Sequence, residues 1–122
     1  MLFLDSNLIT QAGSDGLSEC LKNKQDLRVF NIDNNDIGPN GADNLAKQLN
    51  QNYGLSKLYC DSNRIGPEGA EKIAKCMEMM DSLKKICFEN NNIQDKGVTA
   101  LADALEENDT LLSLYLEANS IT

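Results

Sequence analysis

The fold is decided by a repeated stretch whose fullest copy is Leu55-Ser56-Lys57-Leu58-Tyr59-Cys60-Asp61-Ser62-Asn63-Arg64-Ile65-Gly66-Pro67-Glu68-Gly69-Ala70. Its order of apolar residues, Asn, Ile and Gly returns every 28 residues along the chain. The Asn residues that close the apolar runs are Asn7, Asn35, Asn63, Asn91 and Asn119. A fixed period of this length predicts a solenoid, in which each repeat packs on its neighbours.

The repeat accounts for residues 1–122 as a single domain. Complete units span residues 27–54, 55–82 and 83–110, and partial units span residues 1–26 and 111–122. We number the positions of a unit from its first Leu. Because the chain begins inside one unit and ends inside another, we expect either a fragment or an array without capping segments.

Each unit combines two kinds of periodicity. In residues 27–33 the apolar Phe30 and Ile32 alternate with other residues, which predicts a short strand with one buried face. In residues 41–49 the apolar positions follow helical spacing, at Ala42, Leu45, Ala46 and Leu49. We expect the small Gly-Ala pair that opens each such helix to let the helix approach the sheet closely.

This alternation predicts an α/β solenoid that curves. Parallel strands lie about 4.8 Å apart, whereas packed helices need about 10 Å. The strands should therefore line the concave face and the helices the convex face of a horseshoe. We expect the recurring Asn to bond backbone groups that the turning chain leaves unpaired.

The composition excludes several classes of function. The 19 acidic and 11 basic residues give a formal charge of -8 and a pI near 4.4. This charge argues against nucleic acid and anionic membrane surfaces as partners. The chain has no His, which removes Ser-His-Asp and Cys-His catalysis and His-containing zinc sites. We expect no enzymatic activity, no catalytic residue, no cofactor and no metal.

The sequence also predicts a cytoplasmic location. The first residues lack the basic and apolar regions of a signal peptide, and no window approaches about 18 apolar residues. Cys60 and Cys87 should face opposite sides of the sheet, while Cys20 and Cys76 stand two repeats apart. Neither pair fits a disulfide, so we expect reduced thiols.

The repeated motif quoted above resembles the leucine-rich repeat family, and its 28-residue strand and helix unit resembles the ribonuclease-inhibitor-like class. The resemblance covers the whole chain. Members of similar repeat type include ribonuclease inhibitor, the Ran GTPase-activating protein and the sensing domains of NOD-like receptors. The resemblance implies a binding surface, although a shared fold does not decide function.

The candidate site follows from columns on the expected concave face, where positions 3, 5 and 7 of successive units should stack. Position 7 is acidic in every unit and position 5 carries aromatic residues. The two lysines of position 3, Lys57 and Lys85, should lie at the opposite edge from the acids. The predicted partner-binding residues are Phe3, Asp5, Asn31, Asp33, Asn34, Tyr59, Asp61, Cys87, Glu89, Tyr115 and Glu117.

Two interpretations of these columns stay open. The acidic residues are either a solvated face inherited from a parent repeat or a stripe that attracts Lys and Arg of a partner. The aromatic residues either anchor an interface or reflect the preference of aromatic residues for strands.

The function predicted from these features is a non-enzymatic protein-protein interaction module that binds a protein or basic peptide segment on the concave face. One alternative, which the resemblance implies, is GTPase regulation of the Ran-regulator type, for which Arg28 and Arg64 are the only arginines available. Another is a ligand-sensing repeat fragment of a NOD-like receptor. We also expect self-association through the exposed end strands.

Overall fold

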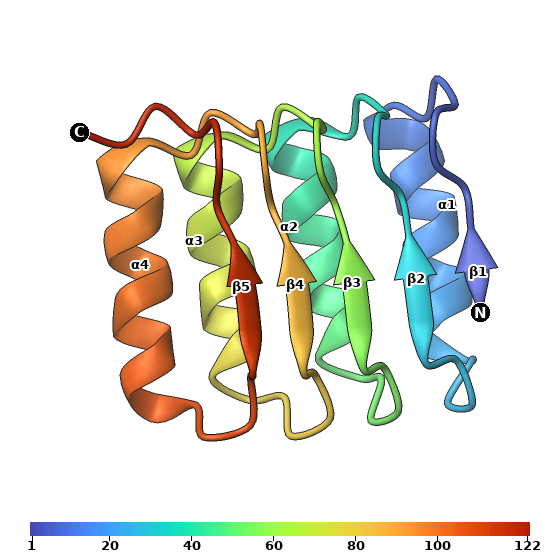
Figure 1. Cartoon of the computed structure of the whole chain (residues 1–122). Coiled ribbons are helices and arrows are strands. Elements are labelled where there is room, and N and C mark those ends of the chain that lie inside the picture. The colour runs from blue at the N-terminus through green and yellow to red at the C-terminus, as the bar shows by residue number, and fades with distance from the viewer.

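The computed structural model describes the whole chain except the side chain of Cys20. Strands and helices alternate throughout (Figure 1). The strands are β1 (Leu2–Phe3), β2 (Val29–Asn31), β3 (Lys57–Tyr59), β4 (Lys85–Cys87) and β5 (Ser113–Tyr115). The helices are α1 (Gln11–Lys22), α2 (Gly38–Leu49), α3 (Gly66–Met77) and α4 (Gln94–Glu107).

The strands form one parallel sheet in the order β1-β2-β3-β4-β5. Residues one repeat apart pair directly, so Lys57 lies between Val29 and Lys85. Each strand is shorter than the predicted run, but the backbone ladder continues beyond it, since the N–H of Ile32 donates to the carbonyl of Tyr59 at 2.9 Å. The predicted α/β solenoid is therefore confirmed.

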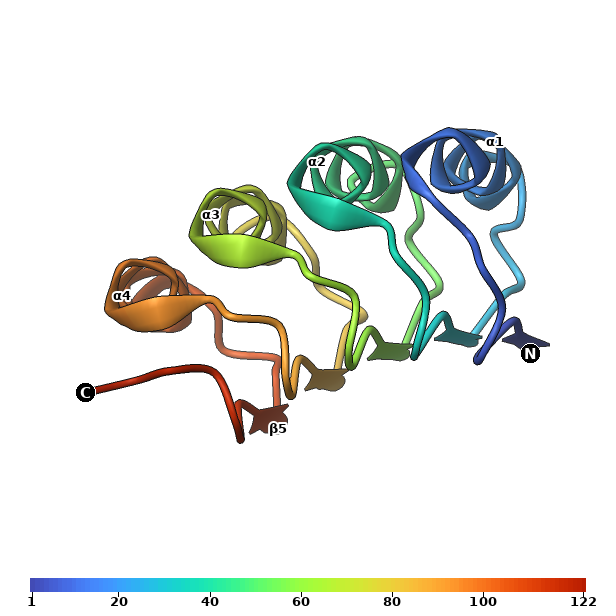
Figure 2. The ribbon, with the colours of Figure 1, turned by 90° about the horizontal axis from the view of Figure 1, so that it is seen from above.

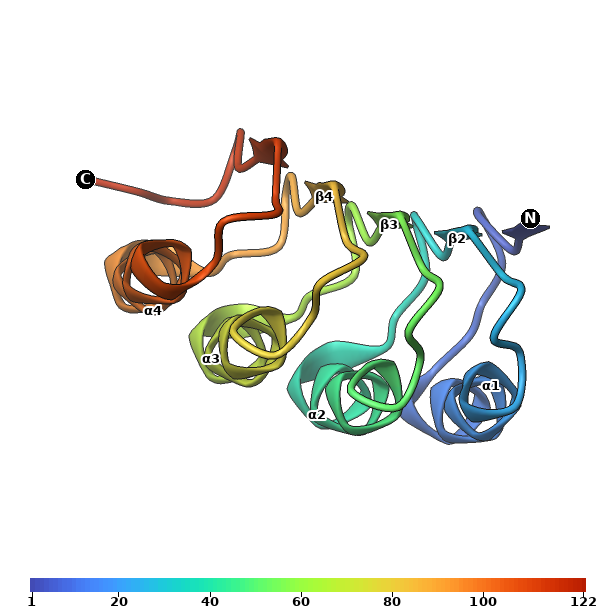
Figure 3. The same ribbon diagram turned by 90° about the horizontal axis from the view of Figure 1, so that it is seen from below.

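The solenoid is curved, with the strands inside and the helices outside. In the views along the strands, the helices fan out more widely than the strands (Figures 2 and 3). This arrangement follows from the larger diameter of a helix compared with the spacing of strands. One face of the sheet is covered by the helices, and the other is the concave face.

The core lies between the sheet and the helices. In α2 the buried residues include the predicted stripe of Ala42, Leu45, Ala46 and Leu49. These side chains pack against apolar residues of the strands and loops, such as the fully buried Leu58. Because the inward residues of each unit meet those of the next, the repeats share one continuous core.

The glycine of the Gly-Ala pair in α3 makes a different contact from the one expected. A Cβ on Gly69 would lie 2.5 Å from Cγ2 of Ile65, 3.1 Å from Cβ of Ala42 and 3.2 Å from Cα of Pro39. Ala42 and Pro39 belong to α2. The expectation of a close approach to the sheet is therefore corrected, because this glycine allows α3 to approach the preceding helix.

The buried Asn ladder confirms the predicted role of the repeated Asn. The amide nitrogen of Asn91 donates to the carbonyls of Cys60 at 2.8 Å and Glu89 at 3.1 Å. Its amide oxygen accepts from the N–H groups of Asn63 at 2.8 Å and Ile65 at 3.3 Å. One side chain thus joins two successive repeats. Buried equivalents are Asn35, Asn63 and Asn119, whereas Asn7 is exposed.

Candidate functional site on the concave face

The structure brings the predicted site residues together in rows across the strands. Cys87 of β4 pairs directly with Tyr59 of β3 on one side and with Tyr115 of β5 on the other. The residues of position 7 come two residues later, where the backbone ladder continues past the end of each strand, so they share the same face. Phe3 and Asn31 continue the aromatic row toward β1. The predicted clustering on one face therefore agrees with the register of the sheet.

The acidic column (Asp5, Asp33, Asp61, Glu89 and Glu117) is also tied to the backbone. A carboxylate oxygen of Asp33 accepts from the N–H of Asp61 at 2.6 Å. In the same way, the carboxylate of Asp61 accepts from the N–H of Glu89 at 2.8 Å. Each of these two carboxylates thus binds the next strand, which the sequence pattern did not indicate.

The acidic column is electrostatically unfavourable in the folded state. Partial burial raises the pKa of Asp33 and Asp61 above the usual range, and neighbouring carboxylates raise it further. The backbone hydrogen bonds that these groups accept oppose the rise. Desolvation and the charges of Asp61 and Glu117 also raise the pKa of Glu89. The folded arrangement of these carboxylates therefore favours their protonated forms.

We expect Asp61→Asn to stabilise the protein by about 0.5 to 1 kcal/mol near neutral pH. The amide oxygen of Asn keeps the acceptor for the N–H of Glu89, while the repulsion from Asp33 and Glu89 is removed. Because the folded pKa of Asp61 is raised, its charge penalty is fully present above that pKa. The difference between variant and parent should fall away as the pH drops below about 3.9, the unfolded carboxyl value.

Urea unfolding of both proteins across this pH range measures the difference. Glu117→Gln is the control, because Glu117 is an exposed residue at the end of the column and should change stability little. An Asp61→Asn protein that is less stable than the parent near neutral pH would contradict the expectation.

The aromatic row is partly accessible. Phe3 is 56% exposed and Tyr115 is 41% exposed, while Tyr59 is half-buried. Asn31 has a local structural role, because its amide oxygen accepts from the N–H of Asp33 at 2.8 Å. Cys87 is only 6% exposed, so its prediction as a partner-contacting residue is corrected. Burial raises the pKa of its thiol to about 11.

Lys85 is a site residue whose position the sequence did not predict. Its Nζ lies 5.2 Å from the ring centroid of Tyr59 and 4.7 Å from that of Tyr115. The charge of Lys85 is therefore held over the middle of the concave face instead of at its edge, while Lys57 is exposed. The sequence did indicate that Lys85 shares a face with Cys87, because it precedes Cys87 by two residues in the same strand.

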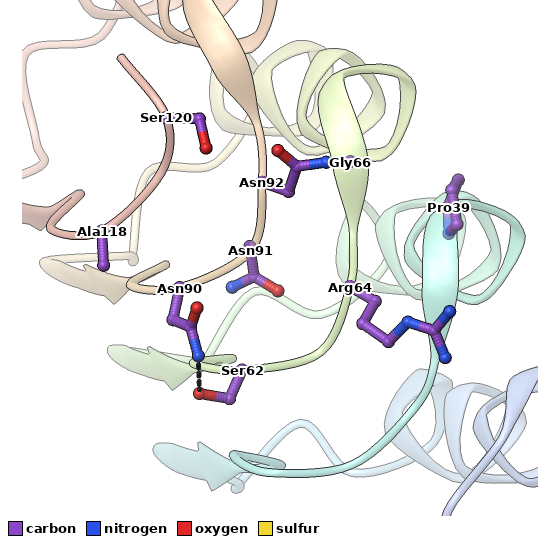
Figure 4. Close-up of a pocket in the computed structure, with 9 residues that line it drawn as sticks. All are labelled: Pro39, Ser62, Arg64, Gly66, Asn90, Asn91, Asn92, Ala118 and Ser120. Carbon is purple, nitrogen blue, oxygen red and sulfur yellow. Dashed lines mark hydrogen bonds between the residues drawn. The ribbon is translucent and has the colours of Figure 1, made fainter.

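An open hollow of about 520 Å³ lies at the rim, beyond the ends of the strands (Figure 4). The amide of Asn90 donates to the hydroxyl of Ser62 at 3.1 Å across it. Most of its lining residues have left-handed backbone conformations, with φ between 53° and 70°. They are Ser62, Arg64, Gly66, Asn90, Asn92, Ala118 and Ser120.

Asn34, which was predicted as a partner contact, lies in a left-handed turn of the same kind as those that line the rim hollow. Asn34 has a φ of 55° and occupies the same repeat position as Ser62 and Asn90. Asn tolerates the left-handed region better than most residues, so the turn accounts for an Asn at this position. Asn34 is exposed at the rim and lies outside the aromatic row.

The two arginines are engaged in contacts within the chain. Nη1 of Arg64 lies 3.1 Å from a carboxylate oxygen of Asp36. Nη1 of Arg28 donates to the carbonyl of Gln25 at 2.8 Å.

The described side chains contain no group of three or more His, Cys, Asp or Glu residues arranged to hold a metal ion. None of the described helices is long and apolar enough to cross a membrane. Cys60, Cys76 and Cys87 are unbridged. The predicted separation of Cys20 from Cys76 concerns a side chain outside the described residues.

Comparisons with known proteins agree with the repeat and the fold. A sequence model of the family described as Leucine Rich repeat matches residues 23–46, 61–74 and 82–102. No curated protein matches the chain. Among solved structures, "Leiomodin-1 Actin-Binding Site 2 (ABS2)" is similar, with 26% identity and a TM-score of 0.84. The match covers 91% of this chain and 65% of that chain. The in-register repeat, the curved α/β solenoid and the family match together show that this chain is built from leucine-rich repeats.

Proposed function

We propose that the chain is a non-enzymatic protein-protein interaction module that binds a basic protein or peptide segment on its concave face. The observation that carries this proposal is an acidic column lying beside accessible aromatic side chains on one open sheet surface. The 28-residue unit supports placement in the ribonuclease-inhibitor-like class. A cytoplasmic location remains part of the proposal.

The leiomodin structure supports a protein as the partner, since it is described as an actin-binding site. The present chain spans 65% of that structure and shares 26% identity with it. These values support a common use of the solenoid as a binding surface. The acidic concave face of this chain points to the chemistry of its own partner, which is a segment rich in Lys or Arg.

The energetics of the acidic column favour a binding role over an inherited solvated face. The backbone bonds that Asp33 and Asp61 accept can also be accepted by the amide oxygen of a neutral Asn, although a carboxylate accepts them more strongly. The pKa of both groups is nevertheless raised, so desolvation and repulsion between the carboxylates outweigh what the charge adds to these bonds. A partner cation placed along the column would relieve the repulsion and would be drawn to the face by long-range attraction.

We expect the variant with Asp33→Asn, Asp61→Asn and Glu89→Gln to bind a blocked peptide of alternating Gly and Arg at least about tenfold more weakly than the parent. This loss corresponds to about 1.4 kcal/mol, which is modest for three charge contacts in a partly shielded surface. Fluorescence anisotropy of the labelled peptide, repeated at two salt concentrations, measures the affinity and its screening.

The matched control carries Glu19→Gln, Glu78→Gln and Glu106→Gln. These exposed carboxylates lie on or next to the helices, and their removal changes the net charge by the same amount. Equal affinities of the two triple variants would attribute binding to net charge alone and would overturn the proposed site.

The alternatives predicted from the sequence have weaker support. Arg64 pairs with Asp36, and Arg28 donates to a backbone carbonyl. Either guanidinium would have to leave its partner within the chain before it could enter a GTPase site. Self-association remains a prediction. Its basis is the exposure of apolar residues near the end strands, with Met1 83% exposed and Leu112 79% exposed.

A further inference from the structure

Tyr59 and Tyr115, which we call the Tyr pair, face each other across one intervening strand. Cys87 lies between them in the register of the sheet. Because its side chain is short and almost completely buried, Cys87 leaves room above it for a group from elsewhere. Strands two apart are separated by about 9.6 Å, a spacing that admits one group between two rings.

In this structure the amine of Lys85 occupies that space. Its distances to the two ring centroids, 5.2 and 4.7 Å, together are close to the separation of the two strands. The amine therefore lies between the rings. Both distances are within the range in which an ammonium is attracted to the face of an aromatic ring.

The surroundings favour a cation over an anion at this place. The faces of the Tyr rings are negative, and Asp61 and Glu89 follow two residues beyond Tyr59 and Cys87 on the same face of their strands. Lys85 forms no ion pair with a carboxylate among the described residues. Its amine lies near both rings, close enough to Asp61 and Glu89 for its charge to lower their pKa, and its residue is still partly exposed to solvent.

Resting on the proposed function, we infer that the Tyr pair is the recognition site for one cationic side chain of the partner, and that Lys85 occupies this site in the free protein. The partner group is an Arg guanidinium, because it is planar, stacks on aromatic faces and is less strongly hydrated than an ammonium. Lys85 must move aside for the Arg to enter. The contact between Lys85 and the rings thus weakens binding and limits it to segments with a suitably placed Arg.

The test uses tyrosine emission, because the chain has three Tyr and no Trp. Tyr53 is 81% exposed in the loop that joins α2 to β3, so Tyr53→Phe leaves only the Tyr pair as emitters. In this background, Lys85→Ser places at position 3 of β4 the residue that β5 has at Ser113. We expect about three- to tenfold tighter binding of the blocked Gly-Arg peptide, with a change in tyrosine emission.

Lys57→Ser is the matched control, since it removes the same charge from the adjacent strand outside the Tyr pair. Its effect should stay within about twofold, because an exposed charge is screened. Adding Tyr115→Leu to Lys85→Ser should abolish the gain. Equal gains from Lys57→Ser and Lys85→Ser, or a gain that persists with Tyr115→Leu, would overturn the inference.

A second peptide tests the opposite possibility, that this site recognises an anion. If a blocked Gly-Glu peptide binds the parent and loses affinity in Lys85→Ser, then Lys85 recognises an anion and the inference is wrong. The proposed acidic column is tested independently in the same assay. If its neutralised variant binds the Gly-Arg peptide as tightly as the parent while the Lys85→Ser gain remains, the proposed function fails and the Tyr pair stands.

Discussion

Asn91→Ala should destabilise the protein by about 3 to 4 kcal/mol. The substitution removes four hydrogen bonds that the Asn91 side chain makes with backbone groups of its own repeat and the preceding one. The N–H groups of Asn63 and Ile65 would remain buried without this acceptor, and each such group costs about 1 to 3 kcal/mol. The total is a large share of the stability of an ordinary domain.

Urea unfolding followed by circular dichroism measures this loss. Asn7→Ala is the matched control, because Asn7 has the same place in its repeat but is exposed and bonds only nearby carbonyls, those of Leu4 and Asp5. We expect the control to lose less than about 1 kcal/mol. Similar losses for the two variants would contradict the role assigned to the buried Asn ladder.

Gly69→Ala should destabilise the protein by about 1 to 3 kcal/mol, although Ala is the better helix former by about 1 kcal/mol. The new Cβ would lie 3.1 Å from Cβ of Ala42 and 3.2 Å from Cα of Pro39. Both atoms belong to α2 or to its rigid first turn, so neither can rotate away. The contact with Cγ2 of Ile65 would be closer still, at 2.5 Å.

Gly16→Ala should have the opposite sign. Gly16 lies within α1, and a Cβ there would meet no atom within 4 Å. The gain in helix propensity is then unopposed and amounts to about 0.5 to 1 kcal/mol. Thermal unfolding of both variants compares them directly. A stabilised Gly69→Ala protein would show that α2 and α3 have room to separate.

Much of the fold could be predicted because the same local pattern of strand and helix recurs in each unit. The alternation around Phe30 and the helical spacing of Leu45 and Leu49 are visible within single units. The buried Asn ladder was also predictable, because a turning buried backbone needs side-chain partners. The contact made by Gly69 was assigned to the wrong neighbour, since the helical stripe does not reveal which adjacent element lies nearest.

The site was predicted as a set of columns, and its details depended on distances between repeats. Cys87 was expected to be accessible because its position alternates onto the concave face, yet its neighbours cover it. The backbone bond to the carboxylate of Asp61 and the place of Lys85 between two rings also involve different strands. A pattern along one chain segment carries no information about such separations.

The sequence by itself determined the period, the parallel register, the choice of inward residues and the sign of charge on the concave face. These features follow from one chain segment and its repetition at 28 residues. Only the tertiary structure decided which helix Gly69 touches, that Cys87 is covered, and that Lys85 lies within the Tyr pair. The physical reason is that periodicity specifies the direction of a side chain, whereas contact requires the distance between neighbouring repeats, which their packing sets.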